Sequence, residues 1–349
     1  MPQPLSRMRW PGMLALGTAG VVTACHEEIE LDGLDVVPEF SQPICGGTLD
    51  KMQQRLDWLV QVTGVPRADR PIRFYWTPHD SGGGCGEGST CVDRRGRVYS
   101  TLELFSHELV HAHLHRYEEI RPWLNEGLAF MLEDNAWPAP ATLLSPSELL
   151  AVERPEDLDY LAAGSFVRFL REEYGMERLM RLYALSEDTT YAQARAVFEA
   201  ALGNTFEEVS ARYAELQPTA PVGSPDCDYP MMVRDGDGWR RRFRADCDDP
   251  DSIGPYFGLT PGLAPYLEAA AVFEVENAGT YEVEARGANI RLSVVSCDLS
   301  RGQGTSGTDV AVTLFLEAGR HRVTVDADID PPQDVDVVVQ PQAAGRAAL

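Results

Sequence analysis

The run His107-Glu108-Leu109-Val110-His111 places the tightest constraint on how this chain folds. Residues four apart on a helix lie on one face, about one turn from each other, so two imidazoles can reach a single zinc ion. Glu108 lies beside them and can take the proton of a water that zinc has acidified. The pattern therefore predicts a helix over residues 102–117 that holds Zn²⁺ through His107 and His111, with Glu108 as general base.

Glu126 is the predicted third zinc ligand. It lies near the start of a second helix, expected over residues 123–135, which follows a turn near Pro122. Fourteen residues separate His111 from Glu126, enough to end one helix, turn, and return antiparallel. The alternative is a pair of surface histidines on an amphipathic helix. It is disfavoured because the flanking residues are apolar enough to bury the helix; they are Leu104, Phe105, Leu109, Val110 and Leu114.

Other histidines and carboxylates near this motif are not expected to bind the metal. His113 points away from the predicted ligand face, and His115 lies too far along the helix from His107 for one ion to take both. We therefore expect His113 and His115 to be structural or surface residues. Glu133 and Asp134 follow Glu126 by two turns, where either can accept a hydrogen bond from a ligand histidine. We interpret both as ordinary surface carboxylates.

The stretch from Val98 to Asn135 resembles the gluzincin metallopeptidases, in which a glutamate on the next helix completes such a zinc site. Its spacing is most similar to small bacterial peptidase-MA-like domains, and the likeness extends over residues 48–215. The resemblance implies a thermolysin-like catalytic domain with His107, His111 and Glu126 as ligands. It also implies an oxyanion-stabilising residue on a later helix, for which Tyr160 is the candidate; a packing tyrosine is the alternative. Residues 97–101 resemble the edge strand that aligns a peptide substrate.

The N-terminus carries a predicted export signal. Arg7 and Arg9 precede an apolar run over residues 13–22, and small residues lead to Cys25, so residues 1–25 have the features of a signal peptide. The ending Val-Thr-Ala-Cys resembles a bacterial lipobox, which implies a membrane anchor through lipid on Cys25. A plain signal peptide cut nearby is the alternative. Both interpretations predict a location in the cell envelope, periplasmic or on the outer face. The acidic residues 26–40 are expected to form a tether.

Hydrophobic periodicity divides the rest of the chain. Helical spacing dominates residues 41–218, and period-two alternation with turn signals dominates residues 222–342. A segment rich in Pro, Gly and Ser separates them. The expected fold class is therefore α+β, with a zinc metallopeptidase domain followed by an antiparallel β-sandwich.

Seven cysteines also suggest an exported protein. Without Cys25 six remain, which predicts three disulfides in an oxidising compartment. Cys85 and Cys91 are close enough in sequence to pair, and Cys227 and Cys247 bracket a short segment. Six cysteines allow fifteen pairings, so the connectivity stays open.

Charge excludes one class of partner. A net charge of −24 repels phosphates, so we expect no nucleic acid partner. Dense aspartates over residues 226–251 leave a calcium site open, against the simpler interpretation of solvated loops.

These observations predict a zinc-dependent peptidase. The aminopeptidase Gly-x-Met-Glu-Asn type of segment is absent before His107, which favours an endopeptidase acting on a peptide or protein substrate. One alternative is a non-catalytic cell-surface binding lipoprotein with a structural zinc site, and another is a zinc hydrolase of some other amide. The intact Glu108 favours catalysis, because a purely structural zinc site needs no general base.

Overall fold

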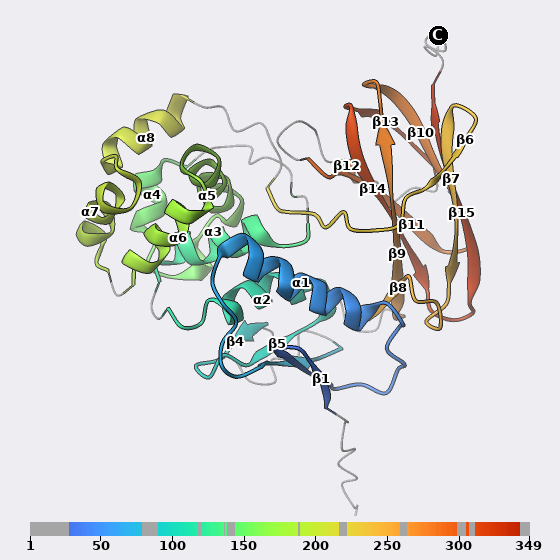
Figure 1. The fold of residues 1–349 in the computed structure, drawn as a ribbon, viewed down its shortest axis with the longest axis horizontal. Coiled ribbons are helices and arrows are strands. Elements are labelled where there is room, and N and C mark those ends of the chain that lie inside the picture. Colours follow the sequence, from blue (N-terminus) through green and yellow to red (C-terminus); the bar gives the residue numbers. More distant parts are fainter. Residues whose placement is uncertain are drawn as a thin grey trace, which may run out of the picture.

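The computed structural model describes residues 28–78, 90–117, 120–135, 137, 144–187, 189–215, 222–258, 264–298, 305–306 and 311–342. The predicted signal segment with Cys25 lies outside the described residues, and so does Cys85. Figure 1 shows a half of helices with a small sheet beside a half made of strands, so the chain is α+β as predicted. Among the described residues no helix is both long and apolar enough to cross a membrane.

A five-stranded sheet lies at the base of the helical half. Its order is β1-β2-β3-β5-β4, and its strands are β1 (Ile29–Leu31), β2 (Leu34–Pro38), β3 (Ile72–Trp76), β4 (Cys91–Val92) and β5 (Val98–Ser100). Strands β2, β3 and β5 run parallel, and the two edge strands β1 and β4 run antiparallel to their neighbours.

Two predictions about this sheet are wrong. Residues 26–40 are not a tether along their length, because β1 and β2 pair with the sheet and bury Leu34 and Val36 completely. The segment 97–101 is not an edge strand, because β5 lies between β3 and β4. The edge position belongs to β4, which sequence analysis did not single out.

Helices cover the sheet and build the rest of this half. They are α1 (Thr48–Thr63), α2 (Phe105–His113), α3 (Pro122–Leu132), α4 (Pro146–Ala151), α5 (Tyr160–Tyr174), α6 (Met176–Leu185), α7 (Tyr191–Leu202) and α8 (Phe206–Glu215), with short 3₁₀ turns η1 (Leu102–Leu104) and η2 (Pro155–Asp157). Leu56 and Leu59 of α1 are buried in the same core as Phe74 and Trp76 of β3. The helix predicted over 102–117 is shorter than expected, since η1 opens it and α2 ends at His113.

The C-terminal half is sandwich-like, as its alternation predicts. One sheet has the order β13-β10-β15-β7-β6 and the other β12-β11-β14-β9-β8. The strands are β6 (Val233–Asp235), β7 (Gly238–Ala245), β8 (Ser252–Tyr256), β9 (Tyr266–Val275), β10 (Gly279–Arg286), β11 (Ile290–Ser296), β12 (Thr305–Ser306), β13 (Ala311–Leu316), β14 (Gly319–Asp328) and β15 (Gln333–Pro341). All their pairings are antiparallel, and inward side chains of both sheets form one core.

The two halves are tied together. Disulfides join Cys45 to Cys247 and Cys227 to Cys297, so Cys227 does not pair with Cys247. Cys91 is also disulfide-bonded. Ile253 of β8 belongs to the core of the helical half, so the packing crosses the predicted domain boundary.

Candidate metal centre

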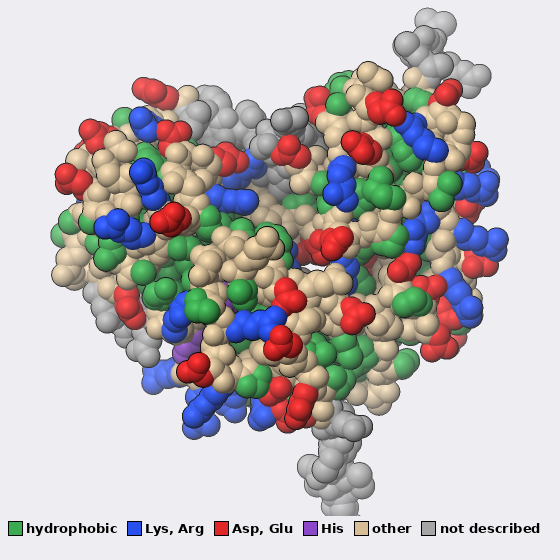
Figure 2. Space-filling view, in the orientation of Figure 1, with side chains coloured by type: hydrophobic (Ala, Val, Ile, Leu, Met, Phe, Trp, Pro, Cys, Tyr) green, Lys and Arg blue, Asp and Glu red, His purple; other side chains and the backbone are tan. Residues whose placement is uncertain are grey.

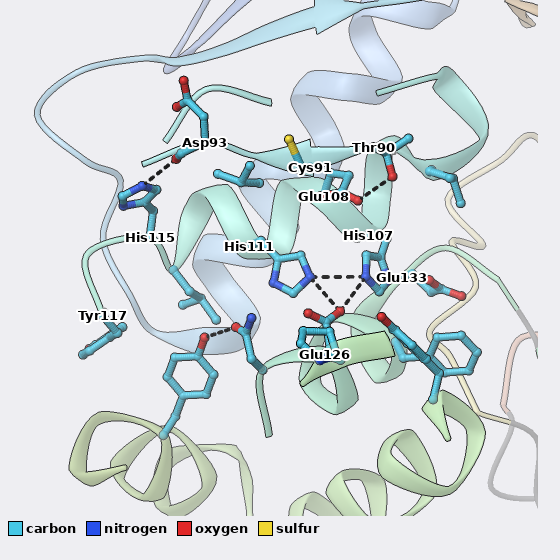
Figure 3. A pocket seen from close by; sticks show the side chains of 18 of the residues that line it. Thr90, Cys91, Asp93, His107, Glu108, His111, His115, Tyr117, Glu126 and Glu133 are labelled. Atoms are coloured by element: carbon cyan, nitrogen blue, oxygen red, sulfur yellow. Dashed lines mark hydrogen bonds and ion pairs between the residues drawn. The ribbon is translucent and has the colours of Figure 1, made fainter. Parts of the chain in front are cut away.

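Three side chains from two helices converge in the helical half (Figure 3). Nε2 of His107 and Nε2 of His111 are 3.2 Å apart, and Oε2 of Glu126 lies 3.3 Å from the first and 3.2 Å from the second. Zinc bonds of about 2.0–2.1 Å in a tetrahedral arrangement require ligand atoms roughly 3.3–3.4 Å apart. The three atoms therefore have the spacing of one face of a zinc tetrahedron, and two imidazoles with one carboxylate suit that metal.

Local packing explains why Glu126 faces the histidines. A Cβ on the adjacent Gly127 would lie 2.9 Å from the backbone oxygen of Ala163 and 2.8 Å from Cγ2 of Val167, both on α5. Glycine at this position lets α3 approach α5 closely. Helices α2 and α3 also contact each other, and Glu126 faces the side of α2 that carries His107 and His111.

Glu108 lies on the same helix as the histidines and lines the same cleft. Its side chain is largely buried, and Thr90, just before β4, donates its hydroxyl to Oε1 of Glu108 at 2.8 Å. This hydrogen bond orients the carboxylate. Thr90 could not be predicted from its neighbours in the sequence, because nothing in the local pattern indicates that β4 runs beside α2.

Glu133 is not a surface carboxylate, contrary to our interpretation. It is 3 % exposed, its Oε2 lies 2.9 Å from Nδ1 of His107, and Nε1 of Trp137 donates to its Oε1. Glu133 therefore contacts Nδ1 of His107, and Nε2 of the same ring faces Glu126. Histidines that bind metals commonly have a carboxylate in this position.

The pKa values of His107 and Glu126 depend on burial and on the charged groups around them. Burial by itself lowers the pKa of His107, but hydrogen bonds to Glu126 and Glu133 outweigh it and raise that pKa to about 10. Burial raises the pKa of Glu126, yet His111 and His107 bring it well below its usual range. Glu126 is therefore an anion at neutral pH, as a metal ligand has to be.

The cleft around these groups has a volume of about 960 Å³ and opens to solvent. Tyr160 lines it as the first residue of α5, whose N-terminus is capped by the Asp159 side chain. The rings of Tyr160 and His107 are 6.4 Å apart, so the candidate lies beside the triad. Tyr183 also lines the cleft, and its hydroxyl donates to Oδ1 of Asn125 at 2.7 Å.

The remaining histidines of this region have other partners. His113 is buried, with Nε2 3.0 Å from the hydroxyl of Thr63, and burial lowers its pKa to about 4. His115 lies with Nε2 2.9 Å from the backbone oxygen of Asp93. Neither belongs to the triad, although His115 also lines the cleft.

Within the described residues, the triad is the one group of three or more potential ligand side chains close enough to share a metal. The aspartates of residues 226–251 form no such group. Asp226 and Asp246 instead form ion pairs with Lys51 and Arg244.

Comparison with known proteins finds no family. No protein-family model matches the sequence, and no curated protein matches it. Among solved structures, PliG of Aeromonas hydrophila, a periplasmic lysozyme inhibitor of g-type lysozyme, is 12% identical with a TM-score of 0.22; the match covers 33% of this chain and 95% of that one. PliG of Salmonella Typhimurium gives the same identity and score, covering 33% and 99%. Similarities this weak assign neither a family nor a function.

Proposed function

We propose that this chain is a zinc-dependent peptidase of the gluzincin type, with a thermolysin-like catalytic arrangement. The observation that carries the proposal is the triad of His107, His111 and Glu126, whose ligand atoms are spaced for zinc and face an open cleft. Three protein ligands leave a fourth position for water or substrate, whereas structural zinc sites use four protein ligands. This favours catalysis over a structural zinc in a binding lipoprotein.

Zinc bound at the triad would acidify a water and polarise the substrate carbonyl. Glu108 lies one residue from a ligand and lines the cleft, so its carboxylate can accept the proton of that water and pass it to the leaving amine. The hydroxyl of Thr90 holds Glu108 in one orientation. Tyr160, which lines the cleft beside His107, would donate a hydrogen bond from its hydroxyl to the oxygen that becomes negative.

The edge strand β4 supports a peptide as substrate. Cys91 and Val92 both line the cleft, and among the described strands β4 pairs with β5 alone, along one side. An extended peptide can add to the other side of β4 as a further antiparallel or parallel strand. The cleft is open at its surface, which favours cleavage within a chain, that is, an endopeptidase.

The disulfides support a location outside the cytoplasm, because such bonds persist in oxidising compartments. We propose an envelope protein anchored by lipid on Cys25, with no nucleic acid partner.

The test compares zinc content and hydrolysis of casein for the unmodified chain and for Glu108→Gln. Both proteins should bind about one zinc, and hydrolysis should fall by at least about a hundredfold in the variant. Glu199→Gln, an exposed carboxylate on α7, is the matched control and should change neither quantity. Absence of zinc from the unmodified chain, or full activity in Glu108→Gln, would contradict the proposal.

A further inference from the structure

The turn between β4 and β5 places an arginine at the cleft. Arg94 lines the same cleft as His111 and Glu126, and it is exposed. The neighbouring Arg95 is also exposed but does not line the cleft. Figure 2 shows basic side chains gathered at the lower edge of the helical half, beside a histidine, in the region where Figure 1 places β4 and β5.

This turn is held in place by several hydrogen bonds. Oδ1 of Asp93 accepts from the backbone nitrogens of Arg95 at 2.8 Å and Arg97 at 3.0 Å, and Oδ2 accepts from Nε of Arg97 at 2.7 Å. Gly96 closes the turn with φ +74°, a conformation that favours glycine. His115 contacts the backbone oxygen of Asp93, which fastens the turn to the segment after α2. Arg94 therefore projects from a fixed support.

The carboxylates that line the cleft have partners other than Arg94. Glu108 accepts the hydroxyl of Thr90. Asp93 is paired with Arg97, Glu133 with His107, and Glu126 with the two histidines. Arg94 forms no ion pair with any of the described residues, in a chain whose net charge is −24. An exposed guanidinium that lines a cleft and has no carboxylate partner in the described part of the chain can bind a ligand.

We propose that Arg94 selects substrates that present a carboxylate toward the β4–β5 turn. A guanidinium binds a carboxylate through two parallel hydrogen bonds, which gives orientation as well as attraction. The carboxylate is either an acidic side chain within the peptide or the free C-terminus. This inference rests on the proposed peptidase function for its substrate, and on Arg94 alone for its selectivity.

Three matched peptides test it. All are N-acetylated and share one sequence: the first has a single Glu and an amidated C-terminus, the second has Gln in its place, and the third is the Gln peptide with a free C-terminal carboxylate. Binding is measured by fluorescence anisotropy on the full, zinc-loaded chain carrying Glu108→Gln, and kcat/KM is measured on the chain with Glu108 intact. Arg94→Gln is the test variant, and Arg95→Gln, on the same turn, is the matched control.

We expect either the Glu peptide or the free-acid peptide to bind about three- to tenfold more tightly than the amidated Gln peptide. This is the range for a partly exposed pair of opposite charges. Arg94→Gln should remove the difference and Arg95→Gln should retain it. Tighter binding of the Glu peptide identifies a side chain as the ligand, and tighter binding of the free-acid peptide identifies the C-terminus. Equal affinities for all three peptides, or a preference that survives Arg94→Gln, overturn the inference.

Different results would reject the peptidase function and the role of Arg94. Preferential binding with no hydrolysis of any peptide or of casein would reject the peptidase function and leave the carboxylate site standing. Hydrolysis of all three peptides at equal kcat/KM, with equal affinities, would reject the role of Arg94 and leave the peptidase function standing.

Discussion

Glu133 and Glu126 contact different nitrogens of the His107 ring: Oε2 of Glu133 lies 2.9 Å from Nδ1, and Oε2 of Glu126 lies 3.3 Å from Nε2. The hydrogen bond selects the tautomer in which Nε2 carries the lone pair for the metal. Glu133→Ala should therefore lower zinc affinity by about 10–100-fold, measured by competition with a chelator. The exposed Glu199→Gln serves as control, and an unchanged affinity in Glu133→Ala would show that packing alone orients the ring.

Zinc binding should release a proton near neutral pH. In the metal-free protein the pKa of His107 is raised to about 10, above the ordinary value of 6.5, so the ring carries a proton that zinc has to displace. Apparent zinc affinity should rise with pH toward 10, by up to about tenfold per unit. Calorimetry in buffers with different ionisation enthalpies counts the released protons, and affinity that does not vary between about pH 7 and 9 contradicts this.

The same shift has a consequence for stability. A histidine whose folded pKa lies above its unfolded value stabilises the fold fully below pH 6.5 and loses that contribution as pH rises through about 10. The metal-free chain should therefore become less stable to urea between these values. Glu133→Gln should reduce the slope, because one of the two carboxylates that hold the proton is then neutral.

Tyr160 should act through its hydroxyl. Burial, more than the nearby carboxylates, raises the pKa of Tyr160 to about 12. The hydroxyl therefore keeps its proton at neutral pH and can donate a hydrogen bond. Tyr160→Phe should lower kcat by about a hundredfold with unchanged zinc content. The exposed Tyr191→Phe on α7 is the control. A change in kcat of less than about twofold would assign Tyr160 to packing against Phe130, whose ring is 6.2 Å away.

Gly127 should tolerate a methyl group poorly. A Cβ there meets the backbone oxygen of Ala163 at 2.9 Å, whereas a Cβ on Gly164 meets only side chains, those of Val222 and Phe130. Backbone of α5 cannot move aside as a side chain can, so Gly127→Ala should cost about 1–3 kcal/mol and Gly164→Ala less. Thermal unfolding of the two variants measures this, and equal losses would refute the distinction.

An ion pair couples the two halves. Nη1 of Arg322 on β14 lies 2.7 Å from Oδ1 of Asp134, just after α3; the arginine is largely buried and the aspartate half-buried. Arg322→Met should cost about 1–3 kcal/mol because Oδ1 of Asp134 then keeps only the backbone nitrogen of Asp226 as a partner. Arg234→Met, which removes an exposed pair with Glu276, should cost under about 1 kcal/mol. Urea unfolding measures both, and similar costs would mean that burial does not matter here.

Local periodicity was enough for part of this fold. The spacing of His107 and His111 places two imidazoles on one face wherever that segment is helical, and the alternation over residues 222–342 requires strands with one buried face. The return of Glu126 toward the histidines followed from the fourteen residues between His111 and Glu126, sufficient for one turn. Each of these is a property of neighbouring residues.

Contacts between distant segments decided the rest. Residues 29–38 are acidic and short in apolar runs, yet β1 and β2 are stabilised by pairing with the sheet and by burying Leu34 and Val36. The position of β5 inside the sheet, the pairing of Cys45 with Cys247, and the burial of Glu133 behind His107 likewise depend on which segments meet in space. A local sequence pattern does not determine these long-range contacts, because the surfaces that stabilise them come together only when the whole chain packs.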